Sequence, residues 1–115
     1  MKFDLEERTT KFGEDVIEFL GGVGESAITK PLISQVVRSA TSIGANYAEA
    51  DDSPTKKDFR YRISVCRRES RETMYWFRML AKAAPNLAEK ARPHWKEAKE
   101  LNLIFSKIWR SCGVS

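Results

Sequence analysis

Basic side chains recur along one side of a helix that the sequence predicts between residues 60 and 82. Their steps of 7, 4, 7 and 4 residues equal whole turns of an α-helix, so the cations share one face. Arginine binds phosphate through paired hydrogen bonds, which suits a row of arginines to a polyanion. The row predicts a nucleic-acid-binding surface; the alternative is a solvated basic face, which is common on long helices. Its members are Arg60, Arg67, Arg71, Arg78 and Lys82.

The remaining reactive side chains form no catalytic or metal-binding pattern. His94 is the only histidine, and its spacing places it on the inner side of a helix, where we expect it to be packed. No Glu-x-x-His pair exists for a carboxylate-bridged metal centre. Cys66 and Cys112 have no paired spacing and are interpreted as buried or incidental thiols. We therefore expect no enzymatic activity, no metal and no cofactor.

Four helical segments would position these residues, and no stretch alternates with the period of a β-strand. Glycines within 21–24 are expected to end the first helix in the left-handed conformation, and Pro93 is expected to interrupt the last segment with either a kink or a fresh helix start. Ser53-Pro54 is expected to open the third helix as its cap and first residue. The expected ranges are about 4–20, 29–51, 53–84 and 86–110.

The third segment carries apolar residues on two separate faces. One face, from Phe59 through Phe77 to Ala81, is expected to fill the bundle core. The second is more apolar surface than a monomeric bundle can cover, and aromatics and methionine are enriched at subunit interfaces. We therefore expect an oligomer interface made of Tyr61, Val65, Trp76 and Met79.

The second segment combines small residues with a polar stripe. Gly44 in mid-helix costs about 1 kcal/mol relative to alanine, which indicates close backbone approach to a neighbouring helix. The stripe is interpreted as a network of polar groups between helices or subunits, with a ligand or RNA contact as the alternative. Charges on packed helices need partners, so we expect charged pairs in the network. The expected network consists of Arg38, Asn46 and Glu49 of the second segment and Glu69 and Glu72 of the third.

Length and charge limit the class of protein. A chain of 115 residues is expected to form one domain, residues 1–115. The net charge is +4, but residues 1–54 are acidic whereas residues 55–82 alone carry nine basic and three acidic groups. No apolar run approaches the roughly 20 residues of a membrane span, and the N-terminus lacks an apolar signal core. We expect a cytoplasmic protein.

Four stretches of the sequence resemble a known family. They are Asp-Leu-Glu-Glu-Arg-Thr-x-Lys-Phe (4–12), Arg-Ser-Ala-Thr-Ser-Ile-Gly-Ala-Asn-Tyr-x-Glu-Ala (38–50), Lys-Lys-Asp-Phe (56–59) and Arg-Glu-Ser-Arg-Glu-Thr-x-Tyr-Trp (68–76). Their order and spacing are similar to the four-helix-bundle proteins encoded by intervening sequences of bacterial large-subunit ribosomal RNA genes. That family includes accessory (variability determinant) proteins of diversity-generating retroelements.

The resemblance implies an all-α, antiparallel up-down four-helix bundle that assembles as a ring-shaped homopentamer without enzymatic activity. It also implies a basic surface suited to nucleic acid and, in retroelement members, an interaction with a reverse transcriptase. The expected function is a non-enzymatic oligomeric module that binds the RNA or DNA backbone with weak sequence preference. The alternative is a protein scaffold that docks an acidic partner or a reverse transcriptase without binding nucleic acid.

Overall fold

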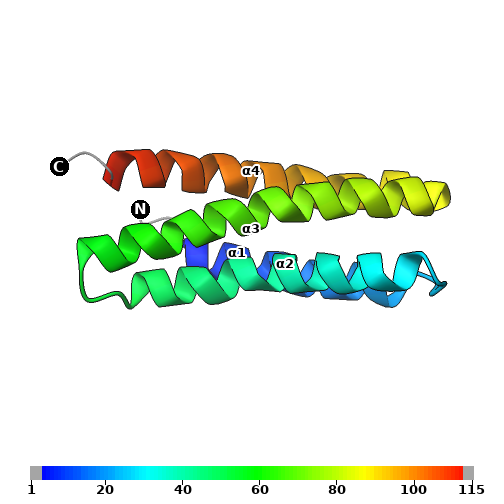
Figure 1. Cartoon of the computed structure of the whole chain (residues 1–115), viewed down its shortest axis with the longest axis horizontal. Coiled ribbons are helices and arrows are strands. Elements are labelled where there is room, and N and C mark those ends of the chain that lie inside the picture. Colours follow the sequence, from blue (N-terminus) through cyan, green and yellow to red (C-terminus); the bar gives the residue numbers. More distant parts are fainter. Residues whose placement is uncertain (1–3, 113–115) are drawn as a thin grey trace.

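The computed structural model describes residues 4–112, which form four long helices and one short 3₁₀ turn. The helices are α1 (Leu5–Gly21), α2 (Thr29–Asp51), α3 (Lys56–Ala83) and α4 (Ala88–Cys112), and the turn η1 (Pro85–Leu87) joins α3 to α4. Consecutive helices run in opposite directions, since each connection is short and lies at one end of the molecule (Figure 1). The described part of the chain is thus all-α, in an up-down arrangement.

Local hydrogen bonds set where α1 and α2 begin. The Asp4 carboxylate accepts from the backbone N–H of Glu7 (3.0 Å) ahead of α1. Ser26 and Thr29 exchange hydrogen bonds between their side-chain oxygens and backbone amides at the start of α2. Each bond satisfies an amide that has no partner within the helix.

The expected start of α3 was wrong by two to three residues. Thr55, not Ser53, is the cap: its hydroxyl accepts from the N–H of Asp58 (3.0 Å), and the helix begins at Lys56. The Ser53 hydroxyl instead donates to the Glu49 carbonyl (2.9 Å) at the end of α2. Pro54 therefore lies in the connection rather than in the first turn.

The glycines end α1 where expected, at Gly21, but not in the expected left-handed conformation. Gly22 caps α1 with φ −96°, its N–H donates to the Phe19 carbonyl (3.1 Å) three residues back, and no glycine among residues 4–112 has a positive φ. Pro93 does not break the last helix, which continues through it from Ala88. Pro93 stands only one and a half turns into α4, and its missing N–H removes a single bond there.

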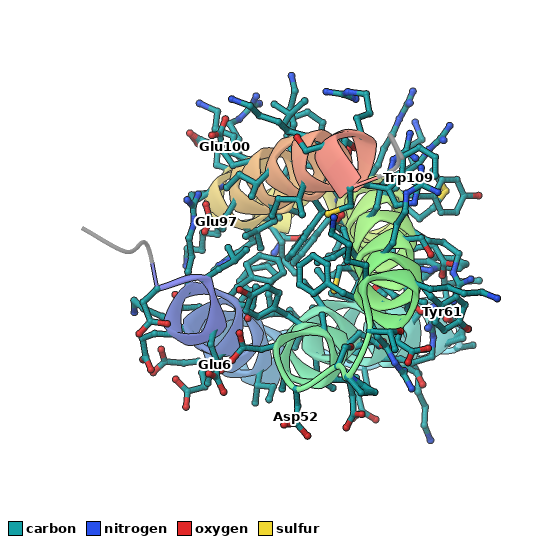
Figure 2. All side chains as sticks on the ribbon, turned by 90° about the vertical axis from the view of Figure 1, so that its left-hand side faces the viewer. Glu6, Asp52, Tyr61, Glu97, Glu100 and Trp109 are labelled. Atoms are coloured by element: carbon teal, nitrogen blue, oxygen red, sulfur yellow. The ribbon has the colours of Figure 1, made fainter. Side chains whose placement is uncertain are left out.

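The core lies between all four helices, as the end-on view in Figure 2 shows. Each helix packs on its two neighbours around the bundle, with the α1–α4 contact the smallest of the four. The expected inner face of α3 is buried, from Ile63 through Cys66 to Phe77, and Leu80 joins it. Gly44 of α2 lies close to the backbone of α1: a Cβ there would stand 3.4 Å from the backbone carbonyl of Thr9, so the expected close approach is confirmed.

Candidate nucleic-acid interface

A polar groove of about 490 Å³ runs along the seam between α3 and α4. Three arginines of α3 line it together with hydroxyl and amide groups, and no carboxylate is among the lining residues. They are Ser64, Arg67, Arg68, Arg71, Met74, Asn102 and Ser106. Three adjacent cations with hydrogen-bonding neighbours suit a phosphate-rich ligand, because phosphate oxygens accept from guanidinium and hydroxyl alike.

Neutral groups of α4 hold two arginines of α3: Arg67, which lines the groove, and Arg60, which does not. The Arg67 Nε donates to Ser106 Oγ (3.1 Å), and its guanidinium carbon lies 4.7 Å from the centroid of the Trp109 ring. Arg60 lies closer to the same ring, at 3.8 Å, and its Nε donates to the Trp109 backbone carbonyl (3.3 Å). Trp109 projects beside α3 in Figure 2. Cation–π contacts orient the guanidinium groups without cancelling their charge.

Asn102 ties α4 to α3 beneath the arginines. Its Nδ2 donates to the Arg67 carbonyl (2.9 Å) and to Ser70 Oγ (3.2 Å). Both acceptors belong to consecutive turns of α3, so one side chain fixes the register of the two helices. The groove therefore has a defined shape rather than being a gap between loosely packed helices.

The structure divides the predicted basic row among different surroundings. Arg60 and Arg67 are half-buried against Trp109, whereas Arg71, Arg78 and Lys82 are exposed. Of the five residues in the predicted row, Arg67 and Arg71 line the groove. Arg78 lines a second hollow, further along the same seam.

The opposite side of α3 forms a different seam, with α2. Arg38 donates to Glu69 (3.2 Å) and Glu72 (2.6 Å), so the expected charged pairs are present within the chain. Burial lowers the pKa of Arg38, but the hydrogen bonds and the charge attraction of Glu72 and Glu69 together outweigh burial, and the net shift of the pKa is upward. The structure gives the Asn46 amide oxygen a bond from Arg62 (3.0 Å).

Glu49 departs from the expected network. Its carboxylate makes no hydrogen bond or ion pair within residues 4–112, and the residue is exposed at the end of α2. Arg62, which was not part of the expected network, is the charged residue that bonds to Asn46.

The expected interface residues differ in how much surface they present. Tyr61 is 61 % exposed, and Trp76 and Met79 are half-buried. Val65 is only 6 % exposed in the single chain, although it is not part of the hydrophobic core cluster. Val65 therefore offers almost no surface to a partner, and that part of the prediction is corrected.

His94 and Cys66 are both packed. The His94 ring lies 5.0 Å from Phe19 and stacks on Phe77 at 5.9 Å between centroids. Burial lowers the pKa of His94, and Asp15 partly opposes this. Burial raises the pKa of Cys66 to about 12, and its thiol donates to the Ile43 carbonyl (3.6 Å).

Residues 2–107 match the family described as 23S rRNA-intervening sequence protein. The chain belongs to this family. No protein with a curated description matches the chain. Among solved structures, the chain is similar to a Bacteroides thetaiotaomicron protein of unknown function from the S23 ribosomal protein family. The two are 25% identical with a TM-score of 0.78, and the match covers 90% of this chain and 96% of the other.

In this 23S rRNA-intervening sequence family member, the described residues contain neither a membrane-spanning helix nor a metal-binding cluster. No helix within residues 4–112 is both long and apolar enough to cross a membrane. The same residues contain no group of three histidine, cysteine, aspartate or glutamate side chains arranged to hold a metal ion.

Sequence reasoning missed the α4 side of the groove in this family member. Asn102, Ser106 and Trp109 recur at steps of 4 and 3, and that helical spacing could have marked them as one face. Arg68 was missed because it lies off the regular row, yet it lines the groove. Nothing in the spacing of α3 alone indicates which part of α4 it meets.

Proposed function

We propose that this chain is a non-enzymatic module that binds the sugar–phosphate backbone of RNA or DNA, in the cytoplasm, as a homo-oligomer. The α3–α4 groove is the binding surface. Phosphate contacts carry no sequence information, so the preference for particular sequences is weak.

The observation that carries the proposal is the absence of carboxylates from a groove lined by three arginines. An arginine already paired with a carboxylate would have to lose that partner before binding phosphate. Among residues 4–112, Arg68 is the one arginine of this groove that forms an ion pair, with Glu69 at 3.8 Å, and Arg68 is largely exposed. Arg67 and Arg71 are therefore available for a polyanion at little cost. The family description, which names a ribosomal RNA element, agrees with such a ligand.

The test is a salt titration of binding to labelled single-stranded RNA and DNA, measured by fluorescence anisotropy. The double variant Arg68→Glu, Arg71→Glu changes exposed side chains and should leave the fold intact. Each phosphate contact contributes about −0.7 to the slope of log affinity against log salt on single strands. The variant should bind more weakly and lose roughly 1.4 from the magnitude of that slope.

A matched control changes the charge equally but elsewhere. Lys30→Glu, Lys90→Glu alters two exposed lysines at the starts of α2 and α4, at the end of the bundle away from the groove. The control should retain most of the affinity. No binding by the unmodified protein at low salt, or equal losses in both variants, would refute the groove. The scaffold that docks an acidic protein or a reverse transcriptase would then be the better reading.

The oligomer is part of the proposal, with a ring-shaped pentamer as its most specific form. Two tyrosines of α3, Tyr61 and Tyr75, are more than half exposed. The Tyr75 ring lies 4.9 Å from the Trp76 ring, and Met79 follows one turn further along the helix. Exposed aromatics on one helix are typical of an interface rather than of a free surface. Light scattering at micromolar concentration should show an assembly, and Tyr61→Asp with Trp76→Glu should reduce it to a monomer that remains helical. A stable monomer before mutation contradicts this part alone.

A further inference from the structure

A second hollow, of about 350 Å³, follows the polar groove along the α3–α4 seam. Its surface is mostly apolar, whereas polar and apolar atoms line the first groove about equally. Its lining residues are Phe77, Arg78, Ala81, Ala88, Ala91, Arg92 and Trp95. Three alanines keep the two helices from filling the space between the aromatic rings, so the hollow follows from the residue sizes.

Unpaired cations stand at the rim of this hollow. Arg78 comes from α3 and Arg92 from α4, and both are exposed. Within residues 4–112 neither guanidinium has a hydrogen bond or an ion pair. Lys99 adds a third cation, with its ammonium 5.6 Å from the centroid of the Trp95 ring. A ligand of this hollow thus has an apolar body and negative charge beside it.

The aromatic residue that lines the hollow restricts the shape of the ligand's apolar part. Trp95 is half-buried and presents an indole to the hollow, next to guanidinium groups that are themselves flat and stack on π systems. A planar ring that stacks on Trp95 while its substituents meet Arg78 or Arg92 would use both features. A nucleobase has a π face and is joined to phosphates on both sides.

The geometry points to a site for one unpaired base of a single-stranded nucleic acid, whose phosphates lie along the arginines of the same seam. The inference rests on the proposed function and names the form of nucleic acid that the surface takes. Arg71 in the polar groove and Arg78 at the hollow are seven residues apart, about 10 Å along α3. One strand can therefore occupy both. A base inside a duplex reaches such a hollow only by leaving its stack.

The test compares two single-stranded DNA oligonucleotides with the same length and phosphates, one with pyrimidine bases and one with abasic sites. Anisotropy at low salt should show the full-length protein binding the base-containing strand about tenfold more tightly, the effect of one stacked base. Trp95→Ala should remove that preference while affinity for the abasic strand stays unchanged. Trp95→Phe keeps a ring and should retain most of the preference.

A control and a direct signal separate this site from a general loss of structure. Leu103→Ala removes an exposed apolar side chain of α4 that lines neither the groove nor the hollow, and the preference should remain. A 2-aminopurine base in the strand should be quenched on binding to the unmodified protein and to Leu103→Ala, but not to Trp95→Ala. Circular dichroism melting checks that each variant is folded.

Equal affinity of the unmodified protein for both strands would overturn the base site and leave backbone binding standing. Binding to neither strand at low salt would overturn both proposals. A preference that survives Trp95→Ala would also overturn the site, since stacking would then occur elsewhere.

Discussion

The two seams that α3 forms with its neighbours carry similar side chains but opposite electrostatics. On the α2 side, arginine meets carboxylate: Arg38 bonds to Glu69 and Glu72 across the seam. On the α4 side, Arg60 and Arg67 meet an indole, a hydroxyl and a backbone carbonyl. Figure 2 shows nitrogen-tipped side chains gathered over α3 and α4, and oxygen-tipped ones around α1.

This difference separates a structural use of arginine from a binding use. A cation held by carboxylates has satisfied its charge, and its removal leaves a buried anion without a partner. A cation held by neutral groups keeps its field, and its removal leaves nothing unpaired. The α2–α3 seam should therefore respond to mutation through stability, and the α3–α4 seam through ligand affinity.

The largest effect is expected from Arg38→Ala in the α2–α3 seam. The Glu69 side chain is only 8% exposed and would lose its shortest partner, although Arg68 remains at 3.8 Å. The free energy of unfolding should fall by about 2 kcal/mol, measured by urea denaturation. Arg71→Ala is the matched change in the other seam and should stay within about 0.5 kcal/mol of the unmodified protein. Equal losses would erase the contrast between the seams.

A smaller effect is expected from Trp109→Leu in the α3–α4 seam. The change removes the ring over which Arg60 and Arg67 lie, while leucine keeps part of the packing against the core. Stability should fall by about 1 kcal/mol, the value of one or two partly exposed cation–π contacts. Affinity for single-stranded nucleic acid should fall several-fold as Arg67 loses its position. Trp109→Phe retains a ring and serves as the control; if it behaves like leucine, the ring does not position the arginines.

The smallest effect is a pH dependence that acts on the α4 side of the bundle. The folded state lowers the pKa of His94, mainly through burial among the rings of Phe19 and Phe77. As pH falls below the ordinary value of 6.5, the unfolded chain therefore binds the proton first. Stability is complete above that value and decreases on acidification.

The pH effect is measured as the change in urea midpoint between about pH 7.5 and about pH 5.5. His94→Phe should show a smaller change, because other titrating groups are common to both proteins. An unchanged pH dependence in the variant would mean that the histidine is not responsible.

Helix number and inner faces were predictable because they depend on local spacing. Leu5, Phe12 and Val16 recur at helical steps, and all three are buried. Helix ends were predicted less accurately, since Ser53 and Thr55 are both good caps and only the path of the connection selects Thr55. Pro93 predicted a kink or a fresh helix start, and the fresh start was wrong because α4 continues through it from Ala88 to Cys112.

For the candidate site, the α3 side was predictable from local spacing and the α4 side was not. Regular spacing found Arg67 and Arg71 on one face of α3. It could not separate Val65, which is buried within the chain, from Tyr61, which is exposed, because both lie on the same side of one helix. Nor could it find the contribution of α4, because contacts between helices depend on their register.

The sequence by itself determined an all-α chain with an acidic first half, a basic third helix and no pattern for metal or catalytic chemistry. These properties reside in composition and in the period of one helix. Only the tertiary structure decided which cations are neutralised. Arg38 meets glutamates because α2 lies against that side of α3, whereas Arg67 meets Ser106 and Trp109 because α4 lies against the other. Charge is a property of residues, but whether it remains available to a ligand depends on which neighbour the fold places beside it.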